Sequence, residues 1–195
     1  TGTLLAQRRP GPTFTNFIEL AWELFDSSEI QREHLKFFDL SNQIEIINSN
    51  LEYHLPDAIG KIDKKLEAII SPSLALLNNP LELSDFTAYA FPVLRGSEGV
   101  LKDVFRKDGI PIHDFGEFFT YNASTGRYKW KEEKNIDELF PEKKLRDNLL
   151  NLYNFYNFER HSVFHVDTTI TTTWTLDYSY AIDLIKEGLK LINKV

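Results

Sequence analysis

The chain has no cysteine, no methionine and no long apolar run. Without cysteine, disulfide bonds, thiolate metal ligands and cysteine nucleophiles are excluded, and nothing indicates an oxidising compartment. No stretch reaches the roughly 20 apolar residues of a membrane-spanning helix, and residues 1–13 lack the hydrophobic segment of a secretion signal. We therefore expect a cytoplasmic protein without membrane contact. Because the initiator methionine is also missing, we expect the chain to be part of a longer protein.

Acidic residues outnumber basic ones, and the formal net charge is −7. This charge argues against a general nucleic-acid coating protein, which carries a basic face for phosphates. A nuclease is not excluded, because a few local cations can hold one phosphate while the acidic remainder weakens binding to bulk RNA. Basic residues do cluster at Arg95, Lys102, Arg106 and Lys107. They are typical either of a solvated helix face or of a phosphate contact.

The distribution of apolar residues predicts one mainly α domain. With 195 residues and 42% hydrophobic content, the chain is long enough for a single substantial core. Residues 1–13, rich in glycine, proline and polar residues, are expected to be a linker or tail, and residues 14–195 a helical bundle. Helical periodicity and stop signals predict helices from Thr15, over 28–53, from Asp57 to Ser71-Pro72, from Ser84 or Asp85 to Gly109–Pro111, over 141–158 and over 175–193.

Two segments depart from the helical pattern. Between His113 and Trp130 the apolar residues alternate around the turn-like Asn122–Gly126, which predicts a β-hairpin insertion at about 113–131. The β-branched run 168–173 is expected to connect to the last helix and cap it. The aromatic run 153–158 suits either base stacking or core packing, and its helical spacing favours the core.

The segment from Glu159 to His165 carries the strongest chemical signal. It contains Arg160, His161 and His165 without glycine or proline. Metal-free RNA cleavage needs a group that moves the 2′-hydroxyl proton and a cation that neutralises the phosphate, and histidine and arginine suit these roles. A second pair, Arg106 and His113, has similar spacing but is interrupted by glycine and proline.

The spacing of Arg160 and His165 leaves several arrangements open. On an ideal helix, residues five apart are rotated by about 140°, so these side chains do not converge within one continuous helix. They meet if the segment crosses a helix end, or if a two-fold partner supplies the second copy of each residue. Alternatively, Arg160 binds a carboxylate such as Asp167 or Asp177, and His165 is a half-buried histidine with a local hydrogen bond.

Arg160-His-Ser-Val-Phe-His165, in a mostly α context, resembles the Arg-x4-6-His signature of HEPN-fold ribonucleases. Within that superfamily, it is most similar to the C-terminal domain of RNase LS-type toxins, the RnlA/LsoA family of type II toxin–antitoxin systems. In that family a glutamate on an earlier helix joins the arginine and histidine, and the segment 94–102 supplies Glu98 at the matching position. The resemblance covers about residues 84–195. The family's further N-terminal domains are missing, and the hairpin insertion has no matched counterpart.

The resemblance implies a metal-independent endoribonuclease that acts as a homodimer and needs no cofactor. In this interpretation His165 transfers the proton, Arg160 clamps the phosphate, and Glu98 orients one of them. His161, together with Arg95 and Lys102 from the basic cluster, would contact RNA. An antitoxin or inhibitor protein is a possible partner. The alternative is a non-catalytic dimerisation or partner-binding helical module of a larger protein.

Overall fold

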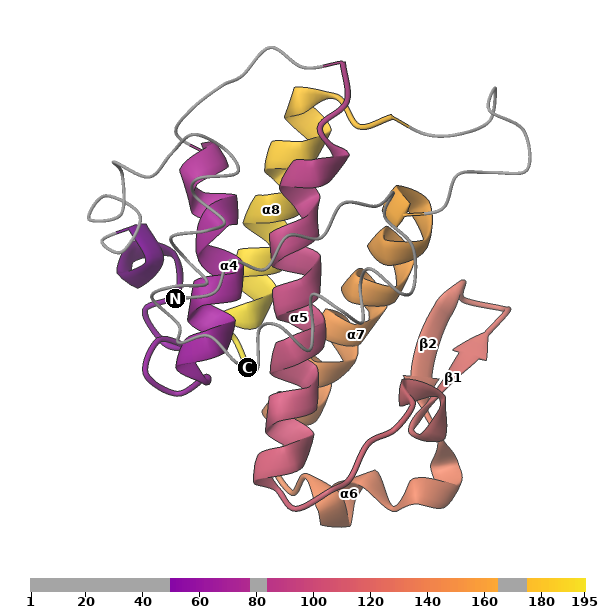
Figure 1. Cartoon of the computed structure of the whole chain (residues 1–195). Coiled ribbons are helices and arrows are strands. Elements are labelled where there is room, and N and C mark those ends of the chain that lie inside the picture. The colour runs from indigo at the N-terminus through magenta and orange to yellow at the C-terminus, as the bar shows by residue number, and fades with distance from the viewer. Residues whose placement is uncertain (1–49, 78–83, 165–174) are drawn as a thin grey trace, which may run out of the picture.

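The computed structural model describes residues 50–77, 84–164 and 175–195, which form a helical domain with one small sheet (Figure 1). Its elements are α4 (Lys64–Leu77), α5 (Thr87–Lys107), η2 (Phe115–Glu117), β1 (Phe119–Asn122), β2 (Arg127–Trp130), η3 (Glu132–Lys134), α6 (Ile136–Leu139), α7 (Lys143–Phe164) and α8 (Tyr178–Ile192). The predicted mainly α fold with a small β-hairpin is confirmed. The predicted tail at 1–13, the helix from Thr15 and most of the helix at 28–53 lie outside the described residues. The limits of the single domain remain a prediction.

Helix α5 is the centre of the bundle, because it packs against α4, α7 and α8 (Figure 1). A helix with three helical neighbours must be apolar on more than one face. Accordingly α5 buries eleven of its residues, among them Tyr89, Val93, Leu101 and Phe105. The buried Ser97 hydroxyl donates to the Val93 carbonyl oxygen at 2.8 Å, so this polar group is satisfied within the helix.

Two glycines let α4 approach α5 closely. A Cβ atom at Gly96 would clash with the branch of the Ile70 side chain, and one at Gly99 would clash with the end of the Leu66 side chain. Both partners are apolar residues of α4. The contact at Gly96 therefore limits the spacing of this helix pair, whereas the leucine end opposite Gly99 can rotate away.

The predicted limits of the α4 helix were wrong at both ends. Residues 56–61 form turns and the helix begins at Lys64, where the Asp63 side chain accepts from the Lys65 amide at 2.8 Å. The helix also continues through Pro72 to Leu77. Proline cannot donate to the Ala68 carbonyl oxygen, but the Ser71 hydroxyl donates to that oxygen at 3.0 Å. This replacement bond reduces the cost of proline inside the helix.

The limits of α5 agree with the sequence signals. Asp85, one residue before the N-cap Phe86, accepts from the Thr87 amide and hydroxyl at 3.1 and 2.7 Å, so the helix begins close to the predicted residue. At the other end Gly109 has a φ of 72°, and the amide of Ile110 donates back to the Phe105 carbonyl oxygen at 2.8 Å. This left-handed glycine ends the helix as predicted.

The predicted hairpin is present and is anchored on α7. Its strands pair in register from Phe119 opposite Trp130 to Asn122 opposite Arg127. The Phe119 ring stacks on Tyr153 of α7 with 3.8 Å between ring centroids. The Asn154 side chain holds the backbone of Tyr128, accepting from its amide at 2.7 Å and donating to its carbonyl oxygen at 3.1 Å.

Helices α7 and α8 differ from the predicted limits. Helix α7 does not end at Phe158 but continues to Phe164, so Arg160 lies within it. Helix α8 begins at Tyr178 rather than Thr175, because the Asp177 carboxylate accepts from the Tyr180 amide at 2.8 Å and caps the helix. The run 168–173, expected to provide this cap, lies outside the described residues. No described helix has both the length and the apolarity needed to cross a membrane.

We predict that Gly96→Ala lowers the free energy of unfolding by about 1–3 kcal/mol, because the new methyl group overpacks the α4–α5 contact. Gly99→Ala is the matched control. Its clash is with the end of a flexible leucine side chain, which can rotate away, and alanine adds about 1 kcal/mol of helix propensity. Urea denaturation followed by circular dichroism measures both. Equal stability of the two variants would show that Gly96 does not limit the helix spacing.

Candidate functional site

The structure brings together two of the three residues predicted for catalysis. Glu98 lies in the middle of α5 and Arg160 lies near the end of α7. His165, the third, lies outside the described residues. The Glu98 side chain is 32% exposed, whereas Arg160 is exposed.

Helical spacing explains how four side chains meet where α5 packs against α7. Glu98 and Lys102 are four residues apart on α5, so they lie on the same helix face, and their side chains form an ion pair of 2.7 Å. Tyr156 and Arg160 are four residues apart on α7. Since α5 packs against α7, the two pairs meet across the helix contact. We call these four residues the Glu98 cluster.

Tyr156 joins the two halves of the cluster. Its hydroxyl donates a hydrogen bond to the Glu98 carboxylate. The Arg160 guanidinium lies over the face of the same ring, with its carbon 5.7 Å from the ring centroid. This distance is within the range of a cation–π interaction. One buried aromatic residue therefore contacts both the anion and the cation of the cluster.

The Glu98 carboxyl is held in its ionised form. Its partial burial raises the pKa, but hydrogen bonds from Lys102 and Tyr156 and the charges of Lys102 and Arg160 outweigh this effect. The pKa of Glu98 therefore lies below its ordinary value. At neutral pH this side chain accepts hydrogen bonds and is a poor proton donor.

The pKa of the Tyr156 hydroxyl is shifted in the opposite direction. Its burial and the neighbouring Glu98 charge raise its pKa well above the ordinary value, although Arg160 opposes this. The hydroxyl therefore keeps its proton at physiological pH. It acts as a hydrogen-bond donor and not as a base.

The residues predicted to contact RNA lie around the cluster. Lys102 belongs to it, with 51% of its side chain exposed. Arg95 precedes Glu98 by three residues on α5, so its position is on the same side of that helix, and it is half-buried. His161 follows Arg160 and is exposed. Of these three residues, Lys102 therefore belongs to the cluster, and Arg95 lies on the same side of α5 as Glu98.

Other interactions bear on the alternative roles of Arg160. Asp177, one of its two candidate partners, uses its carboxylate to cap α8, and Asp167, the other, lies outside the described residues. Helix α7 is continuous from Arg160 to Phe164, so the described part of this segment contains no helix end before Phe164. The neighbouring Glu159 accepts from the Tyr180 hydroxyl at 3.0 Å, which ties this end of α7 to α8.

The prediction that the aromatic run 153–158 packs in the core was correct for Tyr153 and Tyr156, which are 4% and 3% exposed. It was wrong for Phe158, which is 67% exposed. The link from Tyr156 to the charged residues was not predicted. The four-residue spacing from Tyr156 to Arg160 carries this signal, once α7 is known to continue past Phe158.

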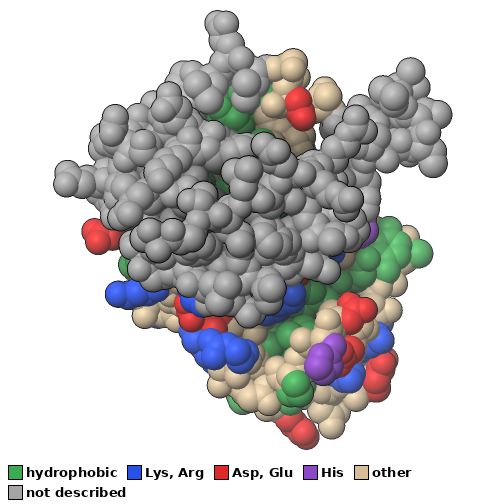
Figure 2. Space-filling model, in the orientation of Figure 1, with side chains coloured by type: hydrophobic (Ala, Val, Ile, Leu, Met, Phe, Trp, Pro, Cys, Tyr) green, Lys and Arg blue, Asp and Glu red, His purple; other side chains and the backbone are tan. Residues whose placement is uncertain are grey.

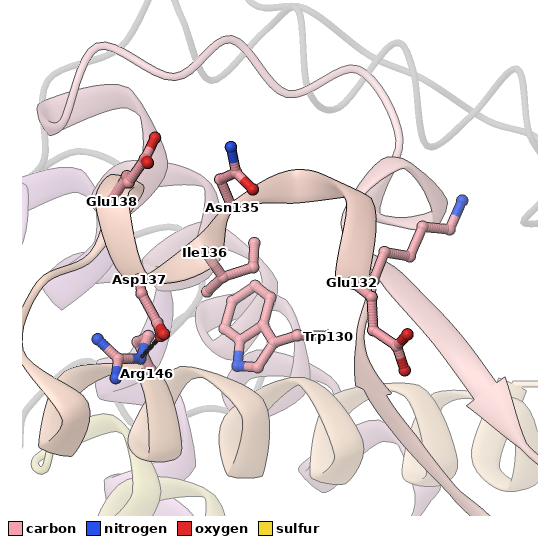
Figure 3. Close-up of a pocket in the computed structure, with 8 residues that line it drawn as sticks. Trp130, Glu132, Asn135, Ile136, Asp137, Glu138 and Arg146 are labelled. Carbon is pink, nitrogen blue, oxygen red and sulfur yellow. Dashed lines mark ion pairs between the residues drawn. The ribbon is translucent and has the colours of Figure 1, made fainter.

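A pocket of about 460 Å³ lies near the start of α7, away from the Glu98 cluster (Figure 3). Arg146, which lines it, precedes Arg160 by 14 residues, or about 21 Å along a helix. Its side chain is held by Asp137 at 3.0 Å and by the Phe140 carbonyl oxygen at 2.6 Å. None of the residues that line this pocket was predicted for chemistry. The lining residues are Trp130, Lys131, Glu132, Asn135, Ile136, Asp137, Glu138 and Arg146.

The described surface carries charges of both signs. In Figure 2, basic and acidic side chains lie next to each other below the grey residues, with hydrophobic side chains exposed beside them. Among the described residues, histidine and acidic side chains do not group in threes in a way that could hold a metal ion.

We predict that the contribution of Glu98 to stability depends on pH. Because its folded pKa is depressed, the carboxylate stabilises the fold above its ordinary pKa of 4.5, and this contribution is lost as pH falls through the lower folded pKa. Glu98→Gln cannot ionise, so its deficit in unfolding free energy is expected at pH 7 and shrinks below pH 4.5. Glu132→Gln, at an exposed ion pair with Lys129, is the control and has a smaller effect. Urea titrations across this pH range measure both, and a pH-independent deficit for Glu98→Gln contradicts the prediction.

The chain is similar to known bacterial toxins. The sequence profile of the family described as "RNase LS, bacterial toxin DBD domain" matches residues 43–167. The chain is 28% identical over 172 residues to mRNA endoribonuclease LsoA of Escherichia coli O157:H7, which covers 87% of this chain and 48% of LsoA. It is 26% identical over 174 residues to mRNA endoribonuclease toxin LS of Escherichia coli strain K12, with the same coverage of 87% and 48%.

A solved structure shares the fold. The crystal structure of Escherichia coli toxin LsoA in complex with T4 phage antitoxin Dmd superposes with a TM-score of 0.75 and 25% sequence identity, over 93% of this chain and 71% of that chain. The chain spans about half the length of the curated relatives it matches. Since the family profile covers more than half of the chain, this protein belongs to the RNase LS bacterial toxin DBD domain family.

Proposed function

We propose that this chain is the ribonuclease domain of a toxin that cleaves RNA in the HEPN manner. The observation that carries the proposal is the Glu98 cluster, which presents an exposed arginine beside an ionised carboxylate near the end of α7. The relatives' names as mRNA endoribonucleases support the same activity. HEPN membership is suggested by the sequence from Arg160 to His165.

The proposed reaction starts with attack of the RNA 2′-hydroxyl on its own phosphodiester. His165 takes up or delivers the proton, and Arg160 stabilises the negative charge that builds on the phosphate. The products are a 2′,3′-cyclic phosphate and a 5′-hydroxyl. A guanidinium suits this role because its planar donors match two phosphate oxygens at once. This route uses no metal ion and no cofactor.

The local charge suits a single phosphate. Glu98 carries one negative charge, and Lys102 and Arg160 carry two positive ones, so the cluster is positive by one unit. Arg95 and His161 extend this region toward RNA in the proposal. The acidic remainder of the chain, with a net charge of −7, weakens binding to RNA elsewhere on the surface.

The proposed active form is a homodimer. Helix α7 is continuous from Arg160 to its end at Phe164. On an ideal helix, residues five positions apart do not point in one direction. A two-fold axis close to the end of α7 would bring Arg160 of one copy near His165 of the other. A composite site of this kind explains why the two residues need not converge within one copy.

The second proposal concerns a protein partner. The solved relative LsoA was crystallised with the phage antitoxin Dmd. We propose that this chain likewise binds an antitoxin or other inhibitor protein. A chain that only dimerises or binds such a partner, without cutting RNA, is the alternative function, and the cleavage assay below separates the two.

We predict that Arg160→Ala and His165→Ala each reduce RNA cleavage in EDTA by at least about 100-fold, the typical loss for a proton-transfer group or a transition-state cation. Arg106→Ala and His113→Ala are matched controls, because they change the other arginine–histidine pair, which is exposed and lies outside the cluster. Gel assays with end-group analysis measure cleavage, and circular dichroism checks the fold. Wild-type protein that cuts no RNA, or cuts only before EDTA is added, contradicts the proposal.

We further predict that mixing the Arg160→Ala and His165→Ala proteins restores cleavage. In a composite dimer, each mixed dimer contains one site with both intact residues, so a fully exchanged equal mixture should regain about a quarter of wild-type activity. The mixture is refolded together from urea to exchange subunits, and its mass in solution is measured. If the mixture is a dimer but remains inactive, each copy uses its own arginine and histidine.

A further inference from the structure

Tyr156 lies between the anion and one cation of the Glu98 cluster. It is 3% exposed, yet it contacts both Glu98 and Arg160, two of the residues proposed for the catalytic site. Its ring also packs edge to face against Phe115, with 6.1 Å between ring centroids. The ring is thus fixed by the core, while its hydroxyl and one face reach charged groups.

The hydroxyl contact constrains Glu98. A half-buried carboxylate needs hydrogen-bond donors, and Glu98 has the ammonium group of Lys102 on its own helix and the Tyr156 hydroxyl from α7. The Lys102 side chain is flexible and half exposed, whereas the Tyr156 ring is buried. The tyrosine is therefore the more rigid of the two donors, and it sets the orientation of the carboxylate.

The ring contact constrains Arg160. An arginine beside a carboxylate tends to close onto it in a paired geometry, which occupies the donors needed for phosphate. Here the guanidinium lies over the aromatic ring. A cation–π contact uses the face of the ring and none of the guanidinium N–H donors. The ring thus holds the cation near Glu98 without consuming its donors.

We infer that Tyr156 is a positioning residue for RNA cleavage, whose hydroxyl orients Glu98 and whose ring holds Arg160 toward the scissile phosphate. This inference rests on the proposed function. Tyr156 does not exchange protons with the substrate, because its hydroxyl is a donor to Glu98. The charged or titratable groups facing it are Glu98 from α5 and Tyr153 and Arg160 from α7.

The chain offers a matched control in Tyr153, one helical turn earlier. It is buried to the same degree, at 4% exposure, and its hydroxyl also has a partner, accepting from the side-chain amide of Asn157 at 3.3 Å. Its ring, however, stacks on Phe119 of the hairpin. Tyr153→Phe and Tyr156→Phe therefore each remove one buried hydroxyl and keep the ring, but only the second touches Glu98.

The test compares wild type, Tyr156→Phe and Tyr153→Phe in the whole chain. Carbon-13 NMR titration of the Glu98 carboxyl is expected to show a higher pKa in Tyr156→Phe, because a donor to the charged form is lost, and no change in Tyr153→Phe. In EDTA, Tyr156→Phe should lower kcat for RNA cleavage about tenfold, the loss expected from one hydrogen bond to a charged group, with KM within twofold. Tyr153→Phe should keep kcat.

The outcomes distinguish the positioning role of Tyr156 from the proposed function. If Tyr156→Phe leaves the Glu98 pKa unchanged, or cuts RNA as fast as wild type, the positioning role is wrong while the proposed function stands. If wild type cuts no RNA, the proposed function fails and the positioning role fails with it, whatever the titration shows. Tyr156→Leu, which also removes the ring face, should lose more activity than Tyr156→Phe. Equal activity of these two variants, with equal helical circular dichroism, overturns the role of the ring.

Discussion

A charged carboxylate in a half-buried helix contact is the constraint on which the rest of this site depends. Glu98 loses part of its hydration where α5 meets α7, and this loss must be balanced by donors and positive charge. Lys102 comes from the same helix, and Tyr156 and Arg160 come from the neighbouring one. Satisfying Glu98 therefore fixes how α7 is rotated against α5, and the glycine contact with α4 fixes where α5 lies.

Consecutive turns of helix α7 contact the hairpin and the Glu98 cluster. Tyr153 stacks on the hairpin ring of Phe119, whereas Tyr156 faces the Glu98 cluster. The two tyrosines are three residues apart, so they lie near each other on one helix surface. A displacement of the hairpin would therefore act on the same rigid helix that carries Arg160. Packing through Tyr153 therefore links the hairpin to the helix that carries part of the Glu98 cluster.

The sequence predicted which secondary-structure elements form better than it predicted where they begin and end. It also pointed to individual site residues better than to the contacts between them. The α5 helix, the hairpin and the charged pair of Glu98 and Arg160 followed from periodicity, turn residues and the resemblance. Pro72 was misjudged, because the replacement bond from Ser71 depends on side-chain geometry that composition does not report. Tyr156 was recognised as buried, but its contact with Glu98 arises only when two helices far apart in sequence are packed together.

The two hydrogen bonds between the Asn154 side chain and the Tyr128 backbone limit association of molecules through the hairpin. Both backbone hydrogen-bonding groups of this residue are used by one asparagine side chain of α7, instead of pointing to solvent. An incoming strand from another molecule finds this position of β2 already saturated, and an open row of amides and carbonyls is what allows edge-to-edge aggregation. A single amide side chain thus protects a short sheet from extending along that edge.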